Sequence, residues 1–202
     1  MITDPNLTLF HLINDIAGKN HVLDSTMIFA AKNIIYIFAA YLACIWLTKS
    51  EYRQEALFAG YASVLGLGIN FIITLFYFHP RPFMVPTGTL LITHAAESSF
   101  PSDHATVMFS VSIMLLAFNY LRYRGAIFLV LAFLSGLARV YSGLHFPMDI
   151  AGSFLVASLS TGILLTLKDY LIPVNRIFIS YFENIEKKII KKFGLKSLIN
   201  VL

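Results

Sequence analysis

The fold is decided by residues 56–78, which read ALFAGYASVLGLGINFIITLFYF and contain no Asp, Glu, Lys or Arg. A helix needs about 20 mostly apolar residues to cross a bilayer, so this stretch predicts a membrane-spanning helix. Similar stretches on either side bring the number of predicted spans to five, at residues 25–48, 55–78, 104–121, 125–142 and 148–167. The sequence therefore predicts an all-α fold, a polytopic membrane bundle of about five spanning helices.

The composition favours the same fold class. Hydrophobic residues make up 57% and charged residues 13% of the 202 residues, whereas a soluble domain has about 45–50% apolar and about 25% charged residues. An ordinary soluble domain is excluded. A disordered chain is excluded too, because disordered segments are polar or highly charged. The single cysteine, Cys44, cannot form an internal disulfide.

The positive charge is concentrated at the carboxyl end. Residues 168–202 contain seven Lys or Arg and three Asp or Glu, an excess of four that equals the net charge of the whole chain. Apolar residues recur opposite the lysines at helical spacing: Phe178, Phe182, Ile185, Ile189 and Phe193. We therefore expect an integral membrane domain over residues 1–168 and a basic amphipathic surface tail over residues 169–202. This pattern favours anionic membrane lipids as the partner of the tail and not nucleic acid.

The amino end predicts a second surface helix. The first 24 residues contain Asp4 and Asp15, lack a basic start and have only a short apolar stretch. They do not read as a secretory signal peptide. We expect them to form a short helix at the membrane interface.

The loops carry their Lys and Arg residues on one side of the predicted spans. That side also carries the tail, and its loop residues are Lys49, Arg53, Arg122 and Arg124. In the opposite loops, 79–103 and 143–147, the only Lys or Arg is Arg81. Because basic loops stay in the cytoplasm, we expect the carboxyl terminus and the tail inside and the amino terminus outside.

Ionisable residues gather at the outer ends of the predicted spans, where they are candidates for function. They are Arg81, His104, Arg139, His145 and Asp149. Two guanidiniums form a planar, multi-donor clamp that suits phosphate. Residues 101–104 and 145–149 also look like helix starts, which bind anions through free N–H groups. Ser102 is the expected cap of the first.

The same residues predict phosphoryl-transfer chemistry. His145 and Asp149 are four residues apart, so they share a helix face if the helix begins early enough, and a carboxylate holds a reacting imidazole in one tautomer. His104 could protonate a leaving oxygen near neutral pH. The arginines could stabilise charge as Mg²⁺ does elsewhere, so no metal or other cofactor is expected.

Three motifs resemble the type 2 phosphatidic acid phosphatase superfamily over residues 55–152. They are Arg81-Pro82, Pro101-Ser102-Asp103-His104 and Arg139-x5-His145-x3-Asp149. The surrounding stretches 79–83, 97–104 and 138–140 resemble the bacitracin-resistance branch of undecaprenyl-diphosphate phosphatases. The sequence departs from the family pattern at three positions: Thr74 for Lys, Asp103 for Gly and Ala138 for Ser.

The resemblance implies a bacterial inner-membrane enzyme whose substrate is a polyprenyl diphosphate. Such an enzyme removes the terminal phosphate of undecaprenyl diphosphate on the outer face of the membrane. His145 would be the nucleophile that forms a phosphohistidine, Asp149 would orient it, and His104 would protonate the leaving lipid phosphate and then activate water. The phosphoryl oxygens would be bound by Arg81, Ser102 and Arg139, with the hydroxyl of Thr74 as a further group.

Three residues are possible accessories. Lys32 lies about 10 Å into the first span and either snorkels, meets a buried partner, or replaces the cation missing at Thr74. Asp103 serves the helix dipole or orients a basic neighbour. His79, like His94, is either a polar loop residue or an accessory of the site.

Other interpretations stay open. Residues 79–100 are long for a connection, and we expect them to form a lid or a lipid-entry loop; Glu97 could serve only to solvate this loop. The substrate could instead be phosphatidylglycerophosphate, phosphatidate or lipid A. A function of another class is non-catalytic lipid-phosphate binding or transport. The sequence leaves the oligomeric state open.

Overall fold

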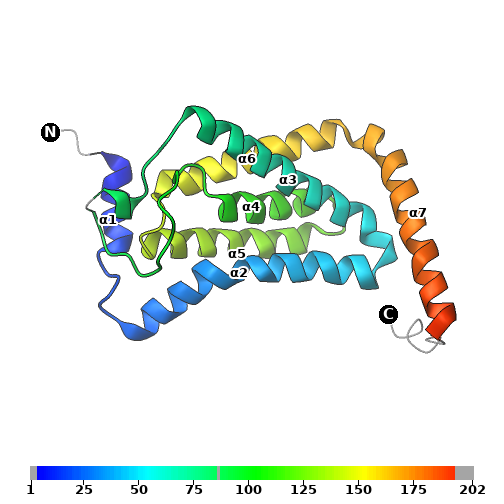
Figure 1. Ribbon diagram of the computed structural model, residues 1–202, viewed down its shortest axis with the longest axis horizontal. Helices are drawn as coiled ribbons and strands as arrows, with labels where there is room; N and C mark the ends of the chain where they lie inside the picture. The colour runs from blue at the N-terminus through cyan, green and yellow to red at the C-terminus, as the bar shows by residue number, and fades with distance from the viewer. Residues whose placement is uncertain (1–3, 86, 194–202) are drawn as a thin grey trace.

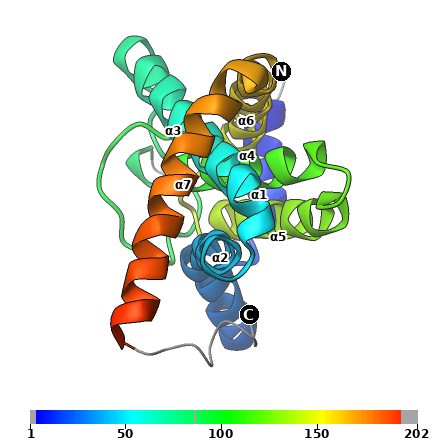
Figure 2. The same cartoon turned by 90° about the vertical axis from the view of Figure 1, so that its right-hand side faces the viewer.

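The computed structural model describes residues 4–85 and 87–193, and the described chain is helical with no strand. Five helices run side by side along the long axis of the molecule, a short helix lies at one end, and a long helix crosses the other (Figures 1 and 2). The α-helices are α1 (Pro5–Asn14), α2 (His21–Thr48), α3 (Arg53–Phe76), α4 (Asp103–Ala117), α5 (Arg122–Tyr141), α6 (Pro147–Thr166) and α7 (Lys168–Phe193). Two short 3₁₀ helices are η1 (Ser50–Tyr52) and η2 (Pro82–Met84).

The predicted membrane bundle is confirmed, and each predicted span coincides with a helix whose ends differ by a few residues. Four of the helices, including α3 together with η1, are long and apolar enough to cross a membrane. The helix α4 is shorter, with 15 residues, or about 22 Å at 1.5 Å per residue. It is also the central helix, packed against α3, α5 and α6. Its side chains therefore face protein more than lipid.

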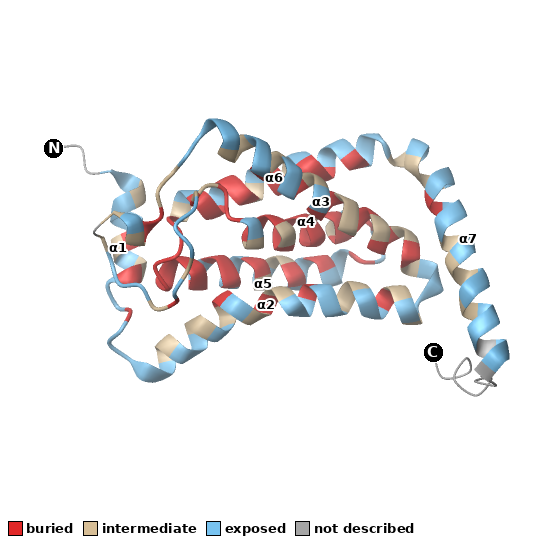
Figure 3. Ribbon diagram, in the orientation of Figure 1, coloured by how far each residue is buried: buried red, intermediate tan, exposed pale blue. Residues whose placement is uncertain are grey.

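The buried core follows these central helices, as Figure 3 shows by the red segments of α4, α5 and α6. Met108, Phe109 and Met114 of α4 are fully buried. Gly152 of α6 is required by close packing, because a Cβ at this position would overlap the ring of Phe100. The start of α6 is thereby packed against the loop that leads into α4.

The predicted amino-terminal helix is confirmed as α1, which packs against the end of the bundle opposite α7 (Figure 1). Phe10 is fully buried against Phe146, with ring centroids 5.1 Å apart. The amide of Asn14 donates to the carbonyls of Thr89 (2.9 Å) and Tyr141 (2.7 Å). This helix therefore fixes the long 79–102 connection to the end of α5.

The predicted tail forms the helix α7, which crosses the opposite end of the bundle (Figure 1). Trp46 of α2 packs on two of its predicted apolar residues, Phe178 and Phe182. The side chain of Phe193 and all of Lys196 lie outside the described residues.

Candidate active site

The candidate site lies at the end of the bundle that α1 covers. It is built from the loop between α3 and α4, the last turn of α5, the turn between α5 and α6, and the first turn of α6. Gly143 has φ +75°, which favours glycine, and it turns the chain from α5 toward α6. His145 follows this turn and is buried, with 1% of its surface exposed.

The ring of His145 is fixed at both nitrogens. Its Nδ1 lies 2.9 Å from the carbonyl oxygen of Ser99, to which only an N–H can donate. Its Nε2 lies 3.2 Å from Nη1 of Arg81 and 3.3 Å from Nη2 of Arg139, which are donors only. These partners assign the proton to Nδ1 and leave a lone pair on Nε2, between the two guanidiniums.

The two arginines are buried and only partly satisfied. Nη1 of Arg81 also donates to the carbonyl of Leu144 (3.2 Å) and Nη1 of Arg139 to that of Ala31 (3.2 Å). Their Nε atoms are buried and have no hydrogen-bond partner among the described residues. Nη2 of Arg81 donates to the carboxylate of Glu97 at 3.2 Å, and that side chain is 59% exposed. Donors without a full set of acceptors are suited to receiving phosphate oxygens.

Asp149 is fully buried beside His145 and lies within ion-pair distance of its ring. Its Oδ2 lies 3.5 Å from Nδ1 of His145. The same oxygen accepts from the amide of Phe146 (2.7 Å) and from the hydroxyl of Ser99. The condition for His145 and Asp149 to share a helix face is not met, because α6 begins at Pro147. They are close because Asp149 folds back on the start of its own helix.

Two further histidines border the site. Nδ1 of His79 lies 3.3 Å from Oδ1 of Asp149, and its ring is tilted against Phe146. His104, in the first turn of α4, is half-buried and lies within electrostatic range of Arg81 and Arg139. The structure therefore brings His104 to the site and places His79 on the far side of Asp149.

Ser102 stands at the N-cap of α4, but the expected capping bond is not made. Its hydroxyl is buried and has no partner among the described residues, whereas its backbone N–H and carbonyl are bound by the hydroxyl of Ser153 at 2.8 and 3.0 Å. This arrangement fixes the backbone of Ser102 and leaves its hydroxyl available to an acceptor.

The structure does not bring three of the predicted residues into contact with the histidines and arginines. The hydroxyl of Thr74 donates to the carbonyl of Phe71 in its own helix (2.8 Å). Asp103 is exposed and accepts from the amide of Asn70 (2.7 Å). Lys32 is exposed on α2. Asp103 thus orients the neutral amide of Asn70 and makes no hydrogen bond to a basic side chain among the described residues.

Burial and charge keep His145 neutral. Burial, together with the positive charges of Arg139 and Arg81, lowers the pKa of His145 to about 3 and outweighs the opposing effect of Asp149. Burial also lowers the pKa of Arg81, an effect that Glu97 and Asp149 partly offset. A neutral imidazole with an unprotonated Nε2 is the form that can attack phosphorus.

Sequence reasoning missed three residues of this arrangement. Ser99 is fully buried between His145 and Asp149, Glu97 binds Arg81, and Ser153 fixes the backbone of Ser102. Only Ser153 had a sequence signal, because it lies four residues after Asp149 and so shares its helix face. Within residues 4–85 and 87–193, no three His, Cys, Asp or Glu side chains are arranged to hold a metal ion.

Comparison with known proteins gives a consistent result for sequence and structure. A family model described as the PAP2 superfamily matches residues 55–173, which include every residue of the site. The chain is 38% identical over 188 residues to the undecaprenyl-diphosphatase BcrC of Bacillus subtilis (strain 168), covering 93% of this chain and 96% of that protein.

Two further relatives were found. The bacitracin transport permease protein BcrC of Bacillus licheniformis is 30% identical over 187 residues, which cover 92% of this chain and 91% of the relative. Among solved structures, the crystal structure of Aquifex aeolicus LpxE superposes with a TM-score of 0.67 at 26% sequence identity, covering 80% of this chain and 94% of that one.

Proposed function

This chain belongs to the PAP2 superfamily, as a multi-pass membrane phosphatase, and on that premise we propose that it hydrolyses undecaprenyl diphosphate to undecaprenyl phosphate through a phosphohistidine at His145. One observation carries the chemistry: the unprotonated Nε2 of a buried histidine lies between two arginine side chains. The relative at 38% identity, an undecaprenyl-diphosphatase, supports the substrate.

In the first step, Nε2 of His145 attacks the terminal phosphorus. The N–P bond forms as the bond between this phosphorus and the bridging oxygen breaks, and the bridging oxygen takes a proton from His104 as undecaprenyl phosphate leaves. In the second step, His104 removes a proton from water, the water oxygen bonds to phosphorus, and the N–P bond breaks to release phosphate.

The phosphoryl oxygens are bound by Arg81, Arg139 and the hydroxyl of Ser102. When the substrate binds, both guanidiniums donate to its phosphate oxygens and no longer to Nε2. The lone pair of Nε2 is then free to attack phosphorus. The unpartnered Nε atoms of the arginines and the unpartnered hydroxyl of Ser102 support this role. Thr74 has no part in this proposal, because its hydroxyl is bonded within its own helix.

Asp149 acts on His145 through Ser99. The carbonyl of Ser99 accepts a hydrogen bond from the Nδ1–H of His145, and the hydroxyl of Ser99 donates to the carboxylate of Asp149. Asp149 thereby stabilises the positive charge that develops on the imidazole during attack. Ser99 is a positioning residue, since it contacts the nucleophile and not the substrate.

We place the site on the outer face of the bacterial cytoplasmic membrane. The support is the charge of the opposite end, where the loops and α7 carry most of the lysines and arginines. In intact cells of a Cys44→Ser strain, a membrane-impermeant maleimide is expected to label Thr93→Cys, in the 79–102 connection, and not Lys187→Cys in α7. The reverse labelling would place the site inside.

Phosphate release from undecaprenyl diphosphate in detergent, with excess chelator, tests the function directly. We expect release by the wild type and none by His145→Ala. The wild type should have a lower kcat/KM on phosphatidylglycerophosphate, phosphatidate and lipid A than on undecaprenyl diphosphate. A higher kcat/KM on one of these lipids would assign that lipid as the substrate and would leave the proposed chemistry unchanged. Binding without release from any of these lipids would refute the enzymatic function and support a transport protein, which is what the name of the Bacillus licheniformis relative describes.

A further inference from the structure

The helix α7 lies across the bundle end opposite the candidate site (Figures 1 and 2). Asn175 is 1% exposed and joins it to α3. Its Oδ1 accepts from the hydroxyl of Tyr61 (3.0 Å), and its amide donates to the side-chain oxygen of Gln54 (2.9 Å). This helix is therefore docked through buried polar contacts, and its orientation is fixed.

A second set of contacts binds both glutamates of the carboxyl half of α7. The guanidinium of Arg53, whose side chain is 3% exposed, donates to Glu183 at 3.3 Å and to Glu186 at 2.8 Å. It also lies over the ring of Phe182, with 5.0 Å between the guanidinium carbon and the ring centroid. The two carboxylates thus face the bundle, where the guanidinium offsets half of their charge.

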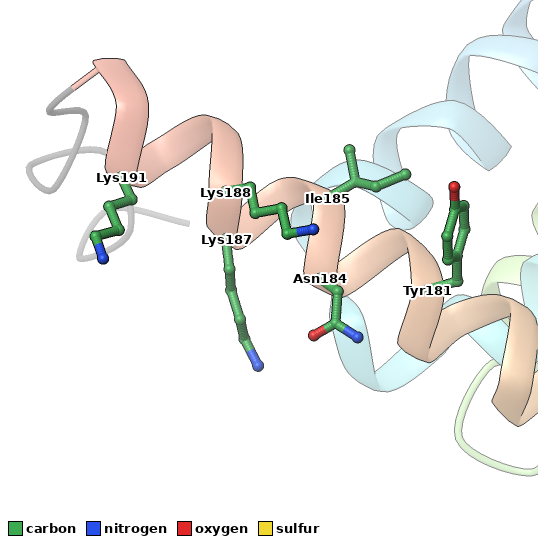
Figure 4. Close-up of a pocket in the computed structure, with 6 residues that line it drawn as sticks. All are labelled: Tyr181, Asn184, Ile185, Lys187, Lys188 and Lys191. Carbon is green, nitrogen blue, oxygen red and sulfur yellow. The ribbon is translucent and has the colours of Figure 1, made fainter.

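The other faces of the same helix combine lysines with apolar side chains. Lys187, Lys188 and Lys191 are exposed, and none of the three is paired with a carboxylate in the described part of the chain. Together with Tyr181, Asn184 and Ile185 they line a hollow of about 550 Å³ (Figure 4). An exposed apolar stripe continues from this hollow toward the start of the helix through Tyr181, Ile177 and Val174.

We propose that the lysine surface formed by Lys187, Lys188 and Lys191 binds the phosphate groups of anionic lipids in the leaflet at this end of the bundle. A surface helix with an apolar stripe beside basic residues lies in the membrane interface, and anionic headgroups attract lysines near that plane. The carboxylates that would repel such headgroups are already bound by Arg53. The apolar stripe favours a lipid over a soluble anion or a nucleic acid.

Hydrogen exchange of the full-length protein in nanodiscs tests this proposal. We compare discs of phosphatidylcholine alone with discs that contain 30% phosphatidylglycerol, and follow the peptide that covers residues 181–192. We expect at least tenfold slower exchange of this peptide with phosphatidylglycerol, since each lysine near an anionic surface contributes roughly fivefold to binding. The protection should fall with added salt.

The triple variant Lys187→Gln, Lys188→Gln, Lys191→Gln should lose this protection and keep its activity in detergent. The matched control is the triple variant Lys49→Gln, Arg122→Gln, Arg176→Gln, which removes the same charge from the same end of the molecule. This control should keep the protection by phosphatidylglycerol. Equal protection in both kinds of disc would overturn the proposal in favour of a purely apolar contact. Protection by inorganic phosphate in detergent would overturn it in favour of a soluble anion.

Discussion

The two ends of the bundle each bury arginines, but they satisfy them differently. At the end that α7 crosses, every nitrogen of Arg53 has an acceptor: its Nε donates to the carbonyl of Trp46, and its two Nη atoms donate to carboxylates of α7. At the end with the candidate site, the Nε atoms of Arg81 and Arg139 have no acceptor among the described residues, and both residues donate to one uncharged imidazole nitrogen.

The difference separates a structural arginine from a binding arginine. A buried guanidinium with a complete set of acceptors joins two elements of the fold, here α3 and α7. A buried guanidinium that lacks acceptors lowers stability unless a ligand supplies them. The incomplete pairing at the end with the candidate site is therefore what we expect if the proposed substrate supplies the missing acceptors.

Replacing the nucleophile should have the largest effect. His145→Gln removes the nitrogen that attacks phosphorus, so kcat should fall by about 10⁴-fold or more. Acid-labile phosphoenzyme, trapped by quenching during turnover, should disappear with it. The exposed His21 serves as the control, since His21→Gln should leave both quantities unchanged. A phosphoenzyme in the His145 variant would assign the nucleophile to another residue.

The two kinds of arginine should respond in opposite ways. Arg139→Met should lower kcat/KM by about 10²–10³-fold, because a donor to the transition-state charge is lost, without lowering the melting temperature. Arg53→Met should lower the free energy of unfolding by about 2 kcal/mol or more and leave kcat of the folded enzyme unchanged. Equal losses of activity in both variants would break the distinction between the two ends.

The positioning of His145 should contribute less than its chemistry. Ser99→Ala keeps the carbonyl that accepts from Nδ1 but breaks the connection to Asp149, so kcat should fall by about 10–100-fold with little change in KM. The matched control is Ser98→Ala. Its hydroxyl contacts the amide of His79 and the carbonyl of Phe100 but not the nucleophile. Similar kinetics for the two variants would leave Ser99 a purely structural residue.

The exposed carboxylate on Arg81 should compete weakly with substrate. Glu97→Gln removes an ion pair whose acidic member is 59% exposed, and such pairs contribute little. We expect KM to fall by about 1.5- to 5-fold with kcat unchanged. Glu51→Gln, which removes an exposed carboxylate at the opposite end of the bundle, should leave KM unchanged. A rise in KM for Glu97→Gln would instead assign Glu97 to substrate binding.

The smallest effect should be a pH dependence of stability. In the unfolded chain His145 takes up a proton near pH 6.5, whereas in the folded protein its pKa is lowered to about 3 by burial. The unfolded state therefore binds more protons as the pH falls below 6.5, and the stability from the neutral buried ring is progressively lost. The melting temperature in detergent should fall by a few degrees between pH 7.5 and 5. His145→Gln should reduce this fall, and an unchanged pH dependence in the variant would contradict the assignment.

Much of the molecule follows from local sequence. The spanning helices were predicted because charge-free stretches of about 20 residues leave no alternative to a helix in a bilayer. The candidate residues His145, Asp149 and Arg139 were predicted because their spacing is short and brings them to adjoining helix ends. α4 was predicted too long, because hydropathy does not register the turn that ends this helix after Ala117.

The remaining features depend on contacts between distant parts of the chain. Ser99 reads as an ordinary loop serine, and only packing brings it between His145 and Asp149, 46 and 50 residues further on. Lys32 and Thr74 were plausible phosphate ligands by position in the sequence, yet the structure leaves the lysine exposed and bonds the threonine within its own helix.

The sequence by itself determined the membrane bundle, the charge difference between its ends and the identity of the candidate nucleophile, since hydropathy and motif spacing are local properties. Only the tertiary structure decided which arginines are satisfied. Arg53 begins α3 and Arg81 lies in the loop after it, but the carboxylate acceptors of Arg53 come from residues 130 and 133 positions away. The number of acceptors around a buried charge is a property of packing, and it is the basis on which we propose different roles for the arginines at the two ends.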